Sequence, residues 1–110
     1  MEPSHLGTGN GLSAVLDHIA SVICDPGEAW IIPAPYYNAF EGDVGDRSGV
    51  KLVAVDIAEG EHGKLAEVER LDQEMTRRAE RGGAKVRAVL FTNPHNPLGD
   101  LFRSLANILD

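Results

Sequence analysis

Two asparagines, each followed by a proline, lie in the segment Thr92–Asp100 and are the first candidates for ligand binding. This segment, the Asn-Pro loop, follows the apolar run Val86–Phe91, which is typical of a strand buried on both faces of a parallel sheet. Because proline pushes the residue before it out of the helical region, Asn93 and Asn96 are expected to be extended, with their amides projecting from a stiff loop. Ligands of open α/β sheets bind at the carboxyl ends of the strands. Asn-Pro pairs also commonly start turns, and on local evidence a plain turn is favoured over a site.

A second candidate is the glycine-rich segment Gly7–Gly11, which leads directly into a predicted helix. The helix should end at Asp25-Pro26-Gly27. The free N–H groups of a first helical turn can hold a phosphate. The segment matches neither the P-loop nor the dinucleotide fingerprint, so a frayed loop is locally favoured over a phosphate site. Apolar residues at helical spacing predict one broad core face, made of Leu12, Val15, Leu16, Ile19, Val22 and Ile23.

Two adjacent tyrosines, Tyr36 and Tyr37, follow a short apolar strand that is closed by Pro33 and Pro35. A tyrosine at a strand exit can pack on the edge of the core or offer its flat face to a planar ligand. In isolation, core packing is favoured for each. The single cysteine, Cys24, lies in an apolar run with no activating base near it in the sequence, so a buried structural role is expected.

Composition excludes several classes of protein. The net charge of -7 argues against a non-specific nucleic-acid binder, since no basic patch could neutralise phosphates. One cysteine excludes a disulfide framework and suggests a reducing compartment. No apolar stretch approaches the roughly 20 residues that span a bilayer, and no signal peptide is evident. We therefore expect a soluble, cytoplasmic protein that does not associate with membranes or nucleic acid. No cluster of metal ligands is predicted.

The elements that must position these residues alternate between helix and strand. A second strand is predicted over Val50–Ile57, and an amphipathic helix over Leu65–Arg81 with a capping Gly82-Gly83. The acidic residues of this helix, Glu67 and Glu74 among them, are assigned to a solvated face. Glu74 and Arg78 should form an i,i+4 ion pair. A last helix is predicted over 101–110, and His62 is expected to be solvent-exposed.

Alternation of this kind predicts an α/β fold with a parallel sheet and helices on its faces. Only three strands are evident in the 110 residues. A three-stranded parallel sheet leaves two open edges and much apolar surface. The chain should therefore be a piece of a larger α/β domain, or it should need a partner to complete its sheet.

Five segments occur in the order Asn10-Gly11-Leu12-Ser13-Ala14, Asp25-Pro26-Gly27-Glu28-Ala29, Pro33-Ala34-Pro35-Tyr36-Tyr37, Arg47-Ser48-Gly49-Val50 and Thr92-Asn93-Pro94-His95-Asn96-Pro97-Leu98-Gly99. Together they resemble the large domain of fold-type I pyridoxal-phosphate enzymes, the class I/II aminotransferases. Within that group the sequence is similar to 1-aminocyclopropane-1-carboxylate synthase and its synthase-like relatives. The resemblance implies a partial three-layer α-β-α sandwich with a mostly parallel sheet, and it makes residues 1–110 one partial large domain.

The resemblance also implies roles for individual residues. Gly11, Leu12 and Ser13 fall where the family binds the phosphate of pyridoxal 5'-phosphate, although the family usually has a smaller residue at the Leu12 position. Tyr37 resembles the tyrosine that stacks on the pyridine ring. Asn96 resembles the asparagine that hydrogen-bonds the phenolic oxygen of the cofactor. Three neighbours receive supporting roles: Tyr36 in the pocket wall, and Asn93 and His95 in shaping the loop.

Other family features have no counterpart in this sequence. The Schiff-base lysine with its Ser-x-Ser-Lys context and the aspartate that pairs with the pyridine nitrogen are missing, and Lys51, Lys64 and Lys85 lack that context. We therefore assign no catalytic residue and expect the chain alone to have no transaminase or lyase activity. Full-length relatives act on amino acids and are commonly homodimers. The alternative is a non-catalytic α/β module that binds a partner or a phosphate ligand.

Overall fold

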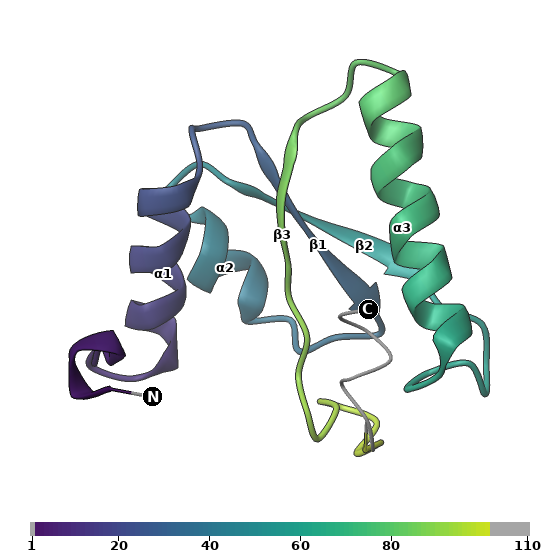
Figure 1. Cartoon of the computed structure of the whole chain (residues 1–110), viewed down its shortest axis with the longest axis horizontal. Helices are drawn as coiled ribbons and strands as arrows, with labels where there is room; N and C mark the ends of the chain where they lie inside the picture. Colours follow the sequence, from purple (N-terminus) through teal and green to yellow (C-terminus); the bar gives the residue numbers. More distant parts are fainter. Residues whose placement is uncertain (1, 102–110) are drawn as a thin grey trace.

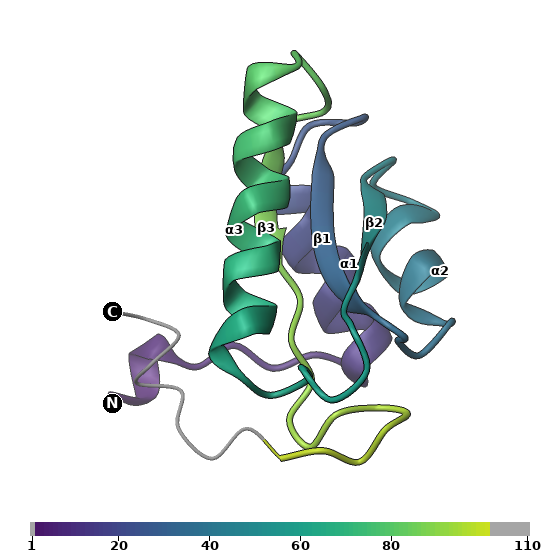
Figure 2. The same cartoon turned by 90° about the vertical axis from the view of Figure 1, so that its right-hand side faces the viewer.

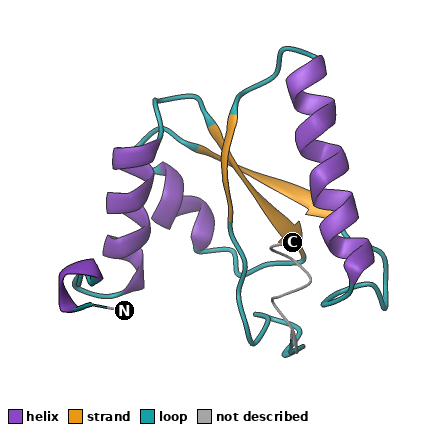
Figure 3. Ribbon diagram, viewed as in Figure 1, coloured by secondary structure: helices purple, strands orange, loops and turns teal. Residues whose placement is uncertain are grey.

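Helices and strands alternate along the chain, as Figures 1 and 3 show. The computed structural model describes residues 2–101. The helix predicted over 101–110 lies outside the described residues, apart from Leu101. The elements are η1 (Pro3–His5), α1 (Leu12–Ile23), β1 (Ala29–Ala34), α2 (Phe40–Gly45), β2 (Lys51–Asp56), α3 (Leu65–Glu80) and β3 (Val86–Val89).

The three strands form one parallel sheet in the order β2-β1-β3, with β1 in the centre. In the register, Ile31 of β1 lies beside Val53 of β2 and Val89 of β3. Helices α1 and α2 cover one face of the sheet and α3 covers the other, which Figure 2 shows nearly edge-on. The α/β fold with its three layers, predicted from the sequence, is confirmed.

The alternating side chains of β1 explain why the sheet is covered on both faces. Successive residues of a strand point to opposite sides. Trp30 and Ile32 pack beneath α1 and α2, whereas Ile31 packs beneath α3. The first core contains Leu16, Ala20, Trp30, Ile32, Phe40, Val44 and Val50, and the second contains Ile31, Val55, Ile57 and Leu71.

The structure corrects two predictions about burial. The strand over Val86–Phe91 was expected to be buried on both faces, but its apolar residues are only half-buried. Within the described residues β3 pairs with β1 alone, so one edge and part of each face stay uncovered. The predicted core face of α1 is also too broad. Leu16 and Ala20 are buried, while Leu12, Ile19, Val22 and Ile23 are exposed because the neighbouring elements cover a narrow stripe of this helix.

Cys24 serves the packing between α1 and β1. The Nε1–H of Trp30 donates a hydrogen bond to Cys24 Sγ at 3.0 Å. The thiol is half-buried and packs against the first core. These contacts agree with the structural role expected of this cysteine.

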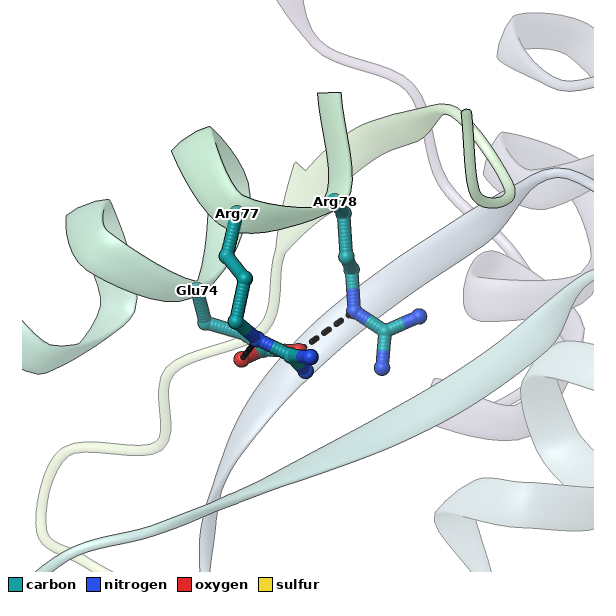
Figure 4. A network of polar contacts seen from close by, with 3 residues as sticks. All are labelled: Glu74, Arg77 and Arg78. Carbon is teal, nitrogen blue, oxygen red and sulfur yellow. Dashed lines mark hydrogen bonds and ion pairs between the residues drawn. The ribbon is translucent and has the colours of Figure 1, made fainter. Parts of the chain in front are cut away.

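The charges of α3 include one fully buried carboxylate and one network in which the side chain of Glu74, predicted on a solvated face, is only 16% exposed. Glu74 accepts hydrogen bonds from Arg77 and Arg78, and the predicted Glu74–Arg78 ion pair is confirmed at 2.7 Å (Figure 4). The solvated position predicted for Glu67 is wrong, because this residue is 0% exposed. It lies one helical turn before the core residue Leu71 and therefore on the inner face of α3. The exposure predicted for His62 is also wrong, since this ring is half-buried against His95.

No helix within residues 2–101 is both long and apolar enough to cross a membrane.

Candidate functional site

The predicted binding residues lie on segments that gather at the carboxyl end of the sheet. The strands are parallel, so the exits of β1 and β3 point the same way. Figure 1 shows the first turn of α1, the segment after β1 and the Asn-Pro loop toward this same, lower end of the molecule. The topology therefore brings the segments that carry Ser13, Tyr37 and Asn96 to one edge of the fold.

The first turn of α1 leaves its backbone donors available. Gly11 is the N-cap residue with φ 88° and ψ 168°, and no side chain caps the helix. Only glycine adopts such a positive φ without strain, and a Cβ at this position would meet open space. Leu12 and Ser13 are exposed, with Leu12 at 60%. Within the described residues, the N–H groups of Leu12, Ser13 and Ala14 have no hydrogen-bond partner. This arrangement can hold an anion.

The two tyrosines after β1 have different environments. Tyr36 is half-buried against the first core, and its hydroxyl donates a hydrogen bond to Glu41 at 2.6 Å. This bond, and burial next, raise the pKa of Tyr36. Tyr37 is 46% exposed, and its ring meets Phe40 edge-on at a centroid distance of 5.5 Å. Core packing therefore holds for Tyr36, whereas the ring of Tyr37 is left partly open to a ligand.

The Asn-Pro loop carries Asn96 on its exposed side. The Asn96 N–H donates to Thr92 Oγ1 at 3.2 Å, which ties this residue to the exit of β3. The peptide bonds before Pro94 and Pro97 are cis. His95 is the buried residue of the loop, and the sequence-based expectation that it shapes the loop agrees with its contacts. Its N–H donates to Asp100 O at 2.7 Å, and its own carbonyl accepts from the Gly99 N–H at 2.7 Å.

Sequence reasoning missed a cluster of titratable side chains beneath this loop. The ring of His95 lies against that of His62, with centroids 5.4 Å apart. Glu67 of α3 is near enough to act on the charge of His95. Burial is the main cause that lowers the pKa of His95, helped by His62 and opposed by Glu67 and Asp100. The spacing of Glu67 to Leu71 was the available signal, because residues four apart share a helix face.

A cavity of about 530 Å³ adjoins the same edge of the sheet. Its lining includes residues next to the predicted contacts, and also His62 and Lys64 from the segment before α3. None of Gly11, Leu12, Ser13, Tyr37 and Asn96 lines it. The lining residues are Pro35, Ile57, Glu59, Gly60, His62, Lys64, Leu98 and Asp100. Across residues 2–101, no group of three or more His, Cys, Asp or Glu side chains is arranged to hold a metal ion.

Comparison with known proteins agrees with the three-layer α/β fold. The sequence profile of the family described as "Aminotransferase class I and II" matches residues 1–105. The chain therefore belongs to the class I and II aminotransferase family.

The relatives include proteins named as aminotransferases and proteins named as 1-aminocyclopropane-1-carboxylate synthases or synthase-like proteins. The chain is 42% identical over 98 residues to a 1-aminocyclopropane-1-carboxylate synthase-like protein 1 of Takifugu rubripes, covering 84% of this chain and 16% of that protein. It is 40% identical over 100 residues to the aminotransferase verI of Clonostachys rogersoniana, covering 90% and 22%. It is 37% identical over 113 residues to 1-aminocyclopropane-1-carboxylate synthase 5 of Oryza sativa subsp. japonica, covering 99% and 20%. The chain thus spans about a fifth of the length of these relatives.

Proposed function

We propose that this chain is part of a pyridoxal-phosphate-dependent enzyme that acts on an amino acid, of the aminotransferase or 1-aminocyclopropane-1-carboxylate synthase-like type. Family membership and the names of the relatives support this function. The chain would supply one wall of the cofactor site. We also propose that the whole enzyme is a homodimer and that its substrate is an amino acid. The single cysteine and the net charge of -7 fit a cytoplasmic protein that does not bind nucleic acid.

The observation that carries the proposal is the uncapped first turn of α1. A phosphate is an acceptor with negative charge, and this turn offers exposed N–H groups after Gly11 together with the hydroxyl of Ser13. The positive end of the helix macrodipole favours an anion by about 0.3–1 kcal/mol at an exposed site. The donors present therefore fit the phosphate of the cofactor. The side chain of Leu12 is largely exposed to solvent, so it leaves the backbone N–H groups accessible to the phosphate.

Two further side chains fit the rest of the cofactor. The half-open ring of Tyr37 can stack on the pyridine ring, and the amide of Asn96 can donate to the phenolic oxygen. When bound, pyridoxal phosphate supplies an electron sink for the charge that forms at the Cα of an amino acid. The residues of this chain would anchor the cofactor and set its orientation.

Two of the three lysines of the chain lie far from the proposed contacts and are poorly suited to covalent attachment of the cofactor. Lys51 begins β2 and Lys85 precedes β3, so both lie at the amino edge of the sheet, opposite the proposed contacts. Lys64 precedes α3 and lines the neighbouring cavity. We infer that the 110-residue chain alone neither transaminates nor eliminates. Stoichiometric attachment of pyridoxal phosphate at one lysine, found by mass spectrometry after borohydride reduction, would contradict this inference.

A titration of the chain with pyridoxal phosphate tests the proposed anchor. Ser13→Ala should weaken binding about 10- to 150-fold, because a hydrogen bond to a charged group contributes about 1.5–3 kcal/mol. Ser21→Ala, at an exposed position of the last turn of the same helix, is the matched control and should bind as the unchanged chain does. Pyridoxal without its phosphate should bind more weakly to all three proteins. Equal affinities for Ser13→Ala and Ser21→Ala would exclude the Ser13 hydroxyl as a phosphate contact, and equal affinities for pyridoxal and pyridoxal phosphate would contradict the phosphate site on α1.

A further inference from the structure

His95 closes the Asn-Pro loop with both its backbone and its side chain. The backbone bonds to Asp100 and Gly99 join the two ends of the turn. In addition, the N–H of Leu98 donates to His95 Nδ1 at 3.3 Å. His95 is 5% exposed, whereas every other residue from 93 to 100 is exposed. The loop is therefore folded around one buried ring.

The bond from Leu98 fixes the protonation state of that ring. Nδ1 can accept a hydrogen bond only when it carries no proton, so the neutral ring holds its proton on Nε2. A second proton would be added at Nδ1 and would turn this acceptor into a donor. Two donors, His95 Nδ1–H and Leu98 N–H, would then face each other. Protonation is thus incompatible with the contact that closes the loop.

The surroundings of the ring come from three segments. The groups that face it are His62 before α3, Glu67 on α3 and Asp100 in the Asn-Pro loop. Burial and His62 disfavour a charged ring, whereas the two carboxylates favour it. Among the described residues, Glu67 Oε1 and His62 Nδ1 are buried without a hydrogen-bond partner. The side chains beneath the loop therefore form a small buried polar cluster, in which adding one proton strongly changes the hydrogen bonds of its neighbours.

We propose that the neutral imidazole of His95 is the positioning group of the Asn-Pro loop, so that protonation of this one ring releases the loop together with Asn96. The effect on cofactor binding rests on the function proposed above, but the release of the loop does not. Because burial lowers the pKa of His95 below the ordinary 6.5, the closed loop is intact above that value. It is lost as the pH falls through the lowered pKa.

Hydrogen exchange in the 110-residue chain tests the proposal. The amides of Leu98 and Gly99 should lose protection about tenfold per pH unit below the midpoint, since each unit changes the protonated fraction tenfold. Amides of the central strand, such as that of Ile31, should keep their protection and so separate loop release from unfolding. His18→Asn, at an exposed position on α1, is the control and should behave as the unchanged chain.

Two substitutions of His95 separate its acceptor from its proton. In His95→Asn, the side-chain oxygen can accept from Leu98 but cannot titrate, so protection should be retained and independent of pH. In His95→Phe, a ring without an acceptor should leave these amides unprotected at every pH. His62→Asn should raise the pH of the midpoint, because His62 helps to lower the pKa of His95.

Each outcome bears on the proposal. A loss of protection with pH in His95→Asn that matches the unchanged chain would overturn it, as would full protection in His95→Phe. If His95→Phe does not fold, the contrast between His95→Asn and the unchanged chain still decides. Loop release without any change in affinity for pyridoxal phosphate would support the positioning role of His95 while contradicting the proposed contact of Asn96.

Discussion

Glu67 carries a carboxylate whose two oxygens have different environments. Oε2 accepts from the Gly63 N–H at 2.6 Å, whereas Oε1 is buried with no partner in the described part of the chain. A buried acceptor without a donor costs about 1–3 kcal/mol. The same residue therefore holds the start of α3 in place and leaves a polar atom unsatisfied. Glu67 lies beneath the Asn-Pro loop, and unsatisfied polar groups of this kind are expected near functional sites.

Replacements of Glu67 should separate these two effects. Glu67→Ala removes the acceptor of Gly63 and should lower the free energy of unfolding by about 1–3 kcal/mol. Glu67→Gln keeps an acceptor oxygen, removes the charge and adds a donor that could serve His62 Nδ1, so its stability should equal or exceed that of the unchanged chain. Urea unfolding at pH 7 measures both. A loss in Glu67→Gln as large as that in Glu67→Ala would show that the charge itself is needed.

Helix α3 owes part of its stability to the Glu74 network, which lies on its half-buried side beside β2. The hydrogen bond from Arg77 is the main cause that lowers the pKa of Glu74. Burial, the next largest cause, opposes it, and the hydrogen bond from Arg78 lowers the pKa further. A lowered carboxyl pKa means that the network stabilises the fold above the ordinary value of 4.5 and that this contribution is lost as the pH falls through the lowered pKa. Pairs of this kind at helical spacing contribute modestly in water.

Glu74→Gln should therefore lower the free energy of unfolding by about 0.5–1 kcal/mol at pH 7. The difference should shrink in high salt and vanish in acid below the pKa of Glu74. Glu69→Gln, an exposed change on the same helix, is the control and should stay within about 0.5 kcal/mol. Thermal unfolding at several pH values gives the comparison. A Glu74→Gln difference that persists unchanged in acid would assign the effect to packing instead of charge.

The elements were readable from sequence where local pattern and tertiary packing agree. The β-branched run after Gly49 became β2, and the helix predicted from Leu65 was observed to Glu80, one residue short of the prediction. Burial was harder to predict, since it depends on what lies across a layer. Periodicity alone could not tell that α1 buries Leu16 but exposes Val22. It also could not bring His62 to His95, because loops distant in sequence meet there.

At the scale of the whole molecule, substitutions on the exposed side of α1 should change the stability of the fold less than substitutions on its buried side. Val22 is 83% exposed, so Val22→Ser should leave the stability within about 0.5 kcal/mol. Ala20 is fully buried on the same helix, and Ala20→Leu should cost about 1–3 kcal/mol through overpacking. Thermal unfolding of both variants tests this difference. Equal destabilisation by the two changes would show that Val22 is covered.

The proposed cofactor site is formed by three separate segments of the chain. Chemical-shift mapping with pyridoxal phosphate tests most directly whether these segments bind the same ligand. The amides of Gly11, Leu12 and Ser13 at the start of α1 should shift together with those of Tyr37 and Asn96, with one common dissociation constant. Amides beside Lys51 and Lys85, at the opposite edge of the sheet, should stay unchanged. Shifts confined to the lysine-bearing edge, or no shifts at the start of α1, would contradict the cofactor site proposed for this chain.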